Sequence, residues 1–305
     1  MEISVRPVRA DDAAAYVRLR RKVTPYRVTT EAAVRHGWRS EPDVAALLVL
    51  VAEARGEIVG IGQASQDTWT SDRGAASGLV MVDPERRGAG VGGALYGAIL
   101  DHLRASGADR LRGWAVDDAE SVRWCERRGL THTRDLRFSR LDLVDIDALP
   151  EAPPLPAGAA LASWAEVEPT AVHQVEAAAT ADEPNEVAVD AMPYDEWLTE
   201  IWEAPETDLD ASTVAVVDGT VVSYALVEAD RSTHRIWSGG AGTLREYRGR
   251  GLAKAVKSAA LRRAAAAGIT TAYTSNDEAN RPMLEVNTWL GYRPCGTELL
   301  YGGRL

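Results

Sequence analysis

The apolar positions of the first half of the chain follow the period of a strand and then that of a helix, in alternation. Apolar runs at 47–53 and 57–64 flank Arg55-Gly56, which predicts two strands joined by a tight turn. A further apolar run at 78–82 predicts a short buried strand. The segment after it repeats apolar residues at steps of four, which predicts a buried helix face made of Val91, Leu95, Ile99 and Leu103.

The remainder of this half continues the alternation of strands and helices. It predicts a strand at 110–116, a helix at 118–128 that ends at Gly129, and a closing strand at 137–143. Residues 11–39, before the first strand, are rich in helix-forming patterns. We therefore expect a mixed sheet with helices on its faces.

The second half repeats this order of elements with different residues. Runs at 213–217 and 221–228 flank Asp218-Gly219, a strong signal for a two-residue hairpin turn. Another strand is predicted at 270–275 and another helix at 280–290. The helix between these regions presents an apolar stripe made of Leu252, Val256, Ala260 and Ala264.

Proline is concentrated at 149–158, where its density excludes regular helix and central strand. We take this segment as the linker between one domain at 1–148 and another at 159–305. The two halves align over a long stretch with a single inserted residue, as the pairs Arg87 with Arg248 and Gly129 with Gly291 show. A length of 305 residues also suits two domains.

Composition narrows the class of partner. The chain carries 45 carboxylates against 34 lysines and arginines, a net charge of −11, which disfavours nucleic acid and anionic membrane and favours a neutral or cationic small molecule. The only cysteines, Cys125 and Cys295, lie far apart and outside any Cys/His cluster, so neither a disulfide framework nor a metal site is indicated. A polar N-terminus and the lack of a long apolar window predict no signal peptide and no membrane span, so we expect a cytoplasmic protein.

Candidate chemistry lies in two glycine-rich loops, 87–92 and 248–253, each between an apolar run and an amphipathic helix. The first turn of a helix presents backbone NH groups without intrahelical partners, so it can bind a phosphate. Glycine has no Cβ to keep the phosphate away, and arginines beside both loops add attraction. Each loop therefore predicts a cradle for an anion, against the simpler alternative of a turn that binds nothing.

Two other nucleotide-binding classes fit these loops less well. Residues 88–93 satisfy G-x-G-x-x-G, but residues 83–87 separate them from the strand, and Lys254 stands where the second copy needs its third glycine. The P-loop pattern G-x-x-x-x-G-K-[ST] occurs in neither copy.

The loops resemble the hallmark of the GCN5-related N-acetyltransferases (GNAT superfamily), [QR]-x-x-G-x-[GA], which both 87–92 and 248–253 satisfy. A later motif of that family matches loosely from Asp118 to Leu130 and more closely from Asn280 to Tyr292. The resemblance covers both halves. It implies an α/β fold with mixed sheets and two tandem GNAT-type acyl-CoA N-acyltransferase domains, similar to two-domain acetyltransferases of the mycothiol synthase type.

The resemblance also implies acetyl-CoA as the acyl donor, with its pyrophosphate on the loops and its pantetheine arm along the preceding strands. The implied donor-binding residues are Val80, Met81, Val82, Arg87, Gly88, Ala89, Gly90, Val91, Gly92, Gly93, Thr243, Leu244, Arg248, Gly249, Arg250, Gly251, Leu252, Ala253 and Asn280.

The family uses a base to neutralise the amine and a tyrosine to protonate the departing thiolate. Cys125 and Asn287 stand at the tyrosine position of the two halves. A cysteine thiol can protonate a thiolate, whereas an asparagine only donates a hydrogen bond, although Cys125 also fits a small buried helix residue. Glu228 and Asp67 are the candidate bases, and each also fits a solvated surface charge. Trp69, in a polar loop, is the candidate substrate contact.

These features predict an acetyl-CoA-dependent N-acetyltransferase that acts on a small-molecule amine by direct transfer in a ternary complex. The alternative is that one half is catalytic and the other is a structural or non-catalytic acyl-CoA-binding module. The motifs do not decide which half is the catalytic one.

Overall fold

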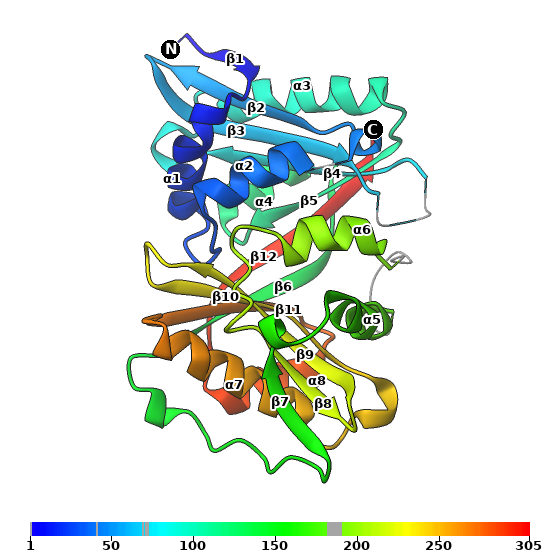
Figure 1. Cartoon of the computed structure of the whole chain (residues 1–305). Helices are drawn as coiled ribbons and strands as arrows, with labels where there is room; N and C mark the ends of the chain where they lie inside the picture. Colours follow the sequence, from blue (N-terminus) through cyan, green and yellow to red (C-terminus); the bar gives the residue numbers. More distant parts are fainter. Residues whose placement is uncertain (1, 41, 69, 71–72, 182–190) are drawn as a thin grey trace. The chain divides into compact units, whose positions relative to one another are not determined.

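The computed structural model describes residues 2–40, 42–68, 70, 73–181 and 191–305, which fold into two compact units (Figure 1). The first unit comprises Met1–Leu136 together with Gly296–Leu305, and the second comprises Arg137–Cys295. Each unit is a mixed sheet with helices on its faces, so the predicted fold class is confirmed.

The sheet of the first unit has its strands in the order β1-β2-β3-β4-β5-β12. Neighbouring strands are antiparallel except for β4 and β5, which are parallel. The strands are β1 (Ser4–Pro7), β2 (Leu48–Ala54), β3 (Glu57–Gln66), β4 (Ala75–Val82), β5 (Arg110–Val116) and β12 (Arg293–Arg304).

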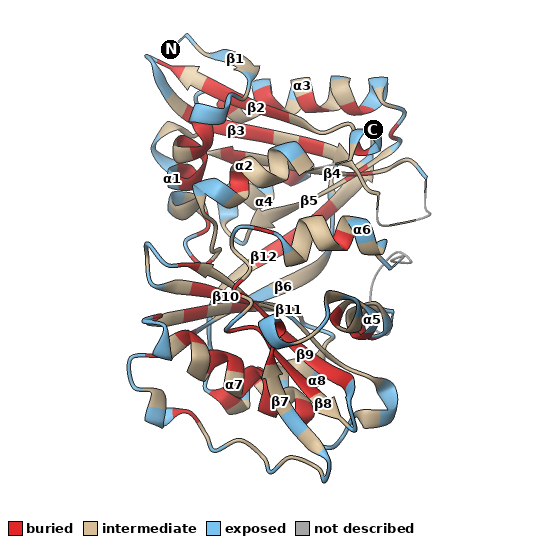
Figure 2. Cartoon of the chain, in the orientation of Figure 1, coloured by how far each residue is buried: buried red, intermediate tan, exposed pale blue. Residues whose placement is uncertain are grey.

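Helices cover both faces of this sheet. They are α1 (Ala13–Val23), α2 (Glu31–Ser40), α3 (Val91–Ala105) and α4 (Ala119–Glu126). Helix α1 packs on the face that carries Val51 and Ile61, whereas α3 packs on the face that carries Leu50 and Ala52. The predicted apolar stripe of α3 is confirmed, because all four of its residues are buried (Figure 2).

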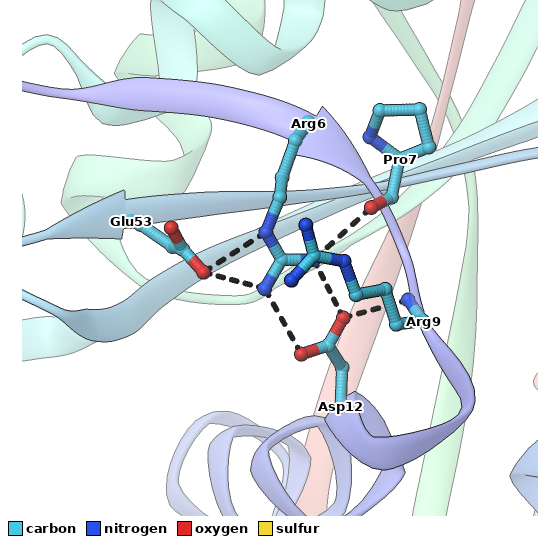
Figure 3. A network of polar contacts seen from close by, with 5 residues as sticks. All are labelled: Arg6, Pro7, Arg9, Asp12 and Glu53. Carbon is cyan, nitrogen blue, oxygen red and sulfur yellow. Dashed lines mark hydrogen bonds and ion pairs between the residues drawn. The ribbon is translucent and has the colours of Figure 1, made fainter.

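A network of ion pairs fixes the start of the first unit (Figure 3). The guanidinium of Arg6 donates from Nη1 to Asp12 Oδ2 at 2.7 Å and from Nε to Glu53 Oε1 at 3.0 Å. Asp12 also accepts from the backbone NH of Arg9 at 2.7 Å. The hydrogen bonds from Arg6 hold the pKa of Asp12 below its ordinary value, so this carboxylate stays charged and ties β1 to β2 and to the start of α1.

The sheet of the second unit has its strands in the order β6-β11-β10-β9-β8-β7. They are β6 (Thr131–Asp142), β7 (Ala159–Ser163), β8 (Thr213–Val217), β9 (Thr220–Asp230), β10 (Arg235–Thr243) and β11 (Thr271–Asp277). The helices are α5 (Pro169–Thr180), α6 (Tyr194–Trp197), α7 (Leu252–Ala266) and α8 (Arg281–Leu290). Helices α7 and α8 pack on the face that carries Val227 and Ile236, and α5 and α6 pack on the face that carries Tyr224 and Leu226.

The two compact units divide the chain at places other than the predicted boundaries. Residues 298–304 of β12 pair with β5 in the first unit, and residues 137–142 of β6 belong to the second. Each sheet is therefore completed by a strand from the other half of the chain. The ranges 1–148 and 159–305 stay a prediction for the two GNAT domains, and 149–158 stays a prediction for the linker between them.

Candidate active site

Both glycine-rich loops open a helix in the structure, as predicted. Gly90 precedes α3 with φ 90°, and Gly251 precedes α7 with φ 79°. The first glycines of the loops, Gly88 and Gly249, both have φ 74°. These left-handed conformations favour glycine, so the local sequence and the loop shape agree.

The first turn of each helix leaves backbone donors available. The first helical hydrogen bonds are donated by Ala94 to Gly90 at 3.1 Å and by Ala255 to Gly251 at 3.0 Å. The amides of 91–93 and 252–254 precede these bonds, so they have no carbonyl one turn earlier to bond. Both loops thus have the donor geometry of a phosphate cradle.

The first loop has acidic and aromatic neighbours. Arg87 donates from Nη1 to Asp118 Oδ2 at 3.3 Å and to Glu120 Oε2 at 3.4 Å, so two carboxylates offset its charge. A Cβ on Gly92 would lie 3.2 Å from Nε1 of Trp124, which packs against the first turn of α3. A phosphate on this loop would meet carboxylates beside the arginine expected to attract it.

The second loop is covered on one side by the proline-rich segment of its own unit. Pro153 Cβ lies 3.0 Å from the position that a Cβ would occupy on Gly251. Arg248 donates from Nε to the carbonyl of Thr243 at 3.0 Å, which holds its side chain against the strand that leads into the loop. Asn280 caps α8, because its Oδ1 accepts from the amide of Met283 at 3.3 Å.

The strands that lead into the loops differ between the units. In both, parallel pairing covers only three residue pairs, and it ends at Ser77 with Arg112 in the first unit and at Trp237 with Tyr273 in the second. Strand β10 then has a bulge, because its register with β9 shifts at 239–240. Strand β4 pairs with β3 in continuous register. The bulge leaves further backbone groups of β10 unpaired at this point, whereas β4 keeps its regular pairing with β3.

The point where β4 and β5 separate is closed by side chains and backbone. Asp67 accepts from Ser77 Oγ at 2.6 Å and pairs with Arg112 Nη2 at 3.2 Å, and its side chain is only 2% exposed. A Cβ on Gly113 would overlap the carbonyl oxygen of Gly78. Asp67 is therefore a buried structural carboxylate, which makes it a poor base.

Glu228 lies beside the bulge of the second unit. Its Oε2 is 2.9 Å from the position that a Cβ would occupy on Gly239, the first bulge residue. Burial, reinforced by the charges of Glu206 and Glu176, raises the pKa of Glu228 to about 8. No hydrogen bond or ion pair of its side chain occurs among the described residues, and a part of the residue stays exposed. A carboxylate with a pKa raised in this way is a candidate for proton transfer.

One of these acids, Glu176, contacts a cluster of aromatic side chains on the α5 face. Trp197 donates from Nε1 to Glu176 Oε2 at 3.0 Å. Its ring lies 6.1 Å from that of Trp164, which stacks on Trp202 with a centroid distance of 5.5 Å. Trp164 and Trp197 are buried, so this cluster belongs to the core of the second unit and anchors Glu176 at its edge.

Cys125 packs in an apolar cluster of the first unit with Leu299 and Tyr301. Burial raises the pKa of its thiol to about 11. This environment supports the simpler interpretation of Cys125 as a core residue of α4. Trp69 lies outside the described residues.

Comparison with known proteins identifies the class to which this fold and these loops belong. The model of the acetyltransferase (GNAT) family matches residues 14–130 and 172–292. The chain belongs to this family and is a tandem GNAT N-acetyltransferase. Membership supports the use of an acyl-CoA donor.

Relatives cover most of the chain. It is 30% identical over 250 residues to the mycothiol acetyltransferase of Streptomyces griseus, covering 81% of this chain and 76% of the relative. It is also 30% identical to the mycothiol acetyltransferase of Actinosynnema mirum, over 86% of each chain. The fold resembles a tandem GNAT protein from the clavulanic acid biosynthesis pathway, with a TM-score of 0.78, 21% identity and coverage of 99% and 98%.

Two negative findings about the described residues bear on the class of site. None of the helices in this part of the chain has the length and apolar character needed to cross a bilayer. Within the same residues, no group of three or more His, Cys, Asp or Glu side chains is arranged to hold a metal ion.

Proposed function

We propose that the chain is an acetyl-CoA-dependent N-acetyltransferase of small-molecule amines, and that the second unit carries out the transfer. The observation that supports this most strongly is the position of Glu228 beside the bulge of β10. A base and an unpaired stretch of backbone thus stand together at the point where two strands separate.

Acetyl-CoA supplies an activated thioester when it is bound. The second loop fits such a donor, because the amides of 252–254 can bind a pyrophosphate and Arg248 adds a positive charge. Thr243, Leu244 and the bulge line the path of the arm that follows. The backbone amides of the bulge would face the carbonyl oxygen as it gains charge, which is worth a few kcal/mol in enzymes that use this device.

Glu228 would take the proton from the incoming ammonium. Its pKa of about 8 lies near that of a base matched to neutral pH, and a cationic amine beside it would lower that value and favour the charged carboxylate. The amine then attacks the thioester directly, in a ternary complex.

The first unit would serve as the non-transferring half. Its strand β4 lacks a bulge, its candidate base Asp67 is held by Ser77 and Arg112, and Arg87 is offset by two carboxylates. We propose a structural or donor-binding role for this unit.

The nature of the acceptor and the location of the protein follow from weaker observations. Relatives named mycothiol acetyltransferase support an acceptor of low molecular weight. The acids that act on Glu228, which are Glu206 and Glu176, support a cationic amine. Two free cysteines fit a reducing compartment such as the cytoplasm.

The test combines calorimetry and a thiol-release assay on the full chain. We expect acetyl-CoA to bind, and we expect at least one amine of a panel (glucosamine, spermidine and phenethylamine) to accelerate thiol release. Absence of acetyl-CoA binding at millimolar ligand would remove the proposal. Binding without release for any amine would leave a non-catalytic acyl-CoA-binding protein instead.

A further inference from the structure

The chain has three lysines among its 34 basic residues, and one of them, Lys257, is buried inside the second unit. It lies on α7 and is 1% exposed. Its Nζ donates a hydrogen bond to Ser238 Oγ at 3.0 Å, and no carboxylate pairs with it among the described residues. A buried ammonium without a counter-ion is costly, so its retention calls for a function.

Lys257 is tied to the point where β10 and β11 separate. Ser238 directly follows the last parallel pair and directly precedes the bulge. Across this point Thr274 donates from Oγ1 to the carbonyl of Ser238 at 2.9 Å. The ammonium thus lies under the junction at which the arm of an acyl donor would end.

Lys257 and Glu228 lie on opposite faces of the same sheet. Ser238 pairs with Val227, which packs in the cluster formed with α7 and α8. Glu228 follows Val227 in the strand, so its side chain points to the other face, where it contacts Gly239. One titratable group is therefore available on each side of the bulge.

The surroundings of Lys257 suit proton transfer. Burial alone lowers its pKa to about 8. The other titratable side chain beside Ser238 is Tyr292, and burial raises its pKa, so the phenol stays neutral. An arginine would remain charged at this site, whereas a lysine with a lowered pKa can release its proton.

The tyrosine position of the family motif holds no proton donor in the second unit. Asn287 stands at the tyrosine position of the family motif, and its Nδ2 donates to Asn276 Oδ1 at 2.5 Å. An amide does not release a proton at neutral pH. A thiol has an ordinary pKa of about 8.5, close to that of Lys257, which is the match that efficient general acid catalysis requires.

We propose that Lys257 is the general acid of the second unit and protonates the sulfur of the departing thiol. This rests on the proposed function. As the nitrogen-to-carbon bond forms, the carbon-to-sulfur bond breaks and its electron pair goes to sulfur, which takes a proton from Lys257 Nζ. The acceptor nitrogen loses two protons in all, taken in turn by Glu228. Glu228 passes both protons to solvent, and Lys257 takes one proton back from solvent, so one proton is released overall.

The first arm of the test observes the lysine itself. Because the chain has three lysines, NMR of protein labelled with ¹³C and ¹⁵N in lysine resolves each side chain, and the signal missing in Lys257→Met assigns the site. We expect that signal to titrate near 8 and to move when coenzyme A is added, but not when desulfo-coenzyme A is added. An equal response to both ligands, or to neither, would overturn the proposal.

The second arm measures turnover. Lys257→Met should keep or raise the melting temperature, because an apolar side chain of similar length replaces a buried ammonium. We expect kcat with acetyl-CoA to fall about 100-fold, and turnover with p-nitrophenyl acetate, whose leaving group needs no proton, to change less than threefold. Equal losses with both donors, or an unchanged kcat, would refute the role of Lys257. If the wild type turns over no amine, the proposed function itself fails, whereas the NMR arm still decides whether the lysine meets the sulfur.

A second variant separates Lys257 from a rival. The hydroxyl of Tyr224 lies 3.1 Å from the position that a Cβ would occupy on Gly240, on the other side of the bulge. We expect Tyr224→Phe to lower turnover with acetyl-CoA and with p-nitrophenyl acetate by the same factor. Selective loss with acetyl-CoA in Tyr224→Phe, and not in Lys257→Met, would assign the proton to the tyrosine and contradict the proposal.

Discussion

The carboxylate of Glu228 touches the strand that it would serve, with Oε2 lying 2.9 Å from the position of a Cβ on Gly239. This contact exists because Gly239 has no side chain. The contact joins the proposed base to the bulge directly. A substitution at Gly239 should therefore lower the rate of transfer more than it lowers the melting temperature.

Gly239→Ala should therefore lower kcat about 10-fold to 100-fold, because the new methyl group displaces the carboxylate from the bulge. The melting temperature should fall only by a few degrees, since the flexible end of Glu228 can move away and Leu226, with Cδ2 at 3.2 Å from the new methyl group, needs to shift only slightly. Gly97→Ala is the matched control. Gly97 lies within α3 and a Cβ there meets nothing within 4 Å, so this variant should keep its activity and gain slightly in stability. Equal kcat in both variants would contradict the assignment of Glu228.

The pH dependence of stability offers a second test of the buried acid. The pKa of Glu228 is raised from an ordinary 4.5 to about 8 in the folded state, so the folded state binds the proton more tightly. The stabilising contribution is complete below pH 4.5 and is lost as the pH rises toward 8. Glu228→Gln removes this loss, so its melting temperature should exceed that of the wild type by a margin that grows between pH 5 and pH 8. A margin independent of pH would mean that Glu228 titrates normally.

The two cradles can be compared through a pair of equivalent glycines. Gly88 and Gly249 share φ 74°, and a Cβ at either meets no protein atom within 4 Å, so alanine strains both loops equally. We expect Gly249→Ala to lower kcat/KM for acetyl-CoA about tenfold more than Gly88→Ala does, because only the second loop serves the transferring unit. Equal losses in kcat/KM would indicate that both loops bind the donor used in catalysis. A larger loss from Gly88→Ala would assign the active site to the first unit.

The exchanged strand β12 depends on a buried ion pair. Arg27 donates from Nε to Glu298 Oε1 at 2.9 Å, and the side chain of Glu298 is 4% exposed. Glu298→Gln leaves the arginine without its counter-ion, so we expect a loss of about 3 kcal/mol in unfolding free energy, measured by urea denaturation. Glu278→Gln, which breaks an exposed pair with Arg137, should cost less than about 1 kcal/mol. Similar losses in the two variants would contradict the structural importance of this contact.

Local patterns in the sequence predicted the elements that carry their own signals. Strands β5 and β8 have the predicted bounds, and the turns at Arg55-Gly56 and Asp218-Gly219 have the positive φ values that such hairpins require. The apolar stripes of α3 and α7 are buried as predicted. The spacing of apolar residues and the residues of a turn determine these segments within a few positions, so the local sequence is sufficient to predict them.

The features that the sequence did not predict depend on contacts between distant segments. Nothing within β12 indicates that it pairs with β5 rather than with a strand of its own half. The cover of Pro153 over Gly251 is equally non-local. Lys257 was missed because an isolated lysine within an alanine-rich helix has the pattern of a surface residue. Lys257 lies next to Val256 and one helical turn before Ala260, both on the predicted apolar stripe, and this spacing could have indicated that it is buried.

The most direct test of the central claim compares Glu228→Gln with Glu203→Gln, an exposed carboxylate of the same unit, in single-turnover transfer from acetyl-CoA to an active amine. We expect Glu228→Gln to bind acetyl-CoA normally but to transfer the acetyl group at least about 100-fold more slowly, whereas Glu203→Gln should match the wild type. Transfer at the wild-type rate by Glu228→Gln would contradict catalysis in the second unit.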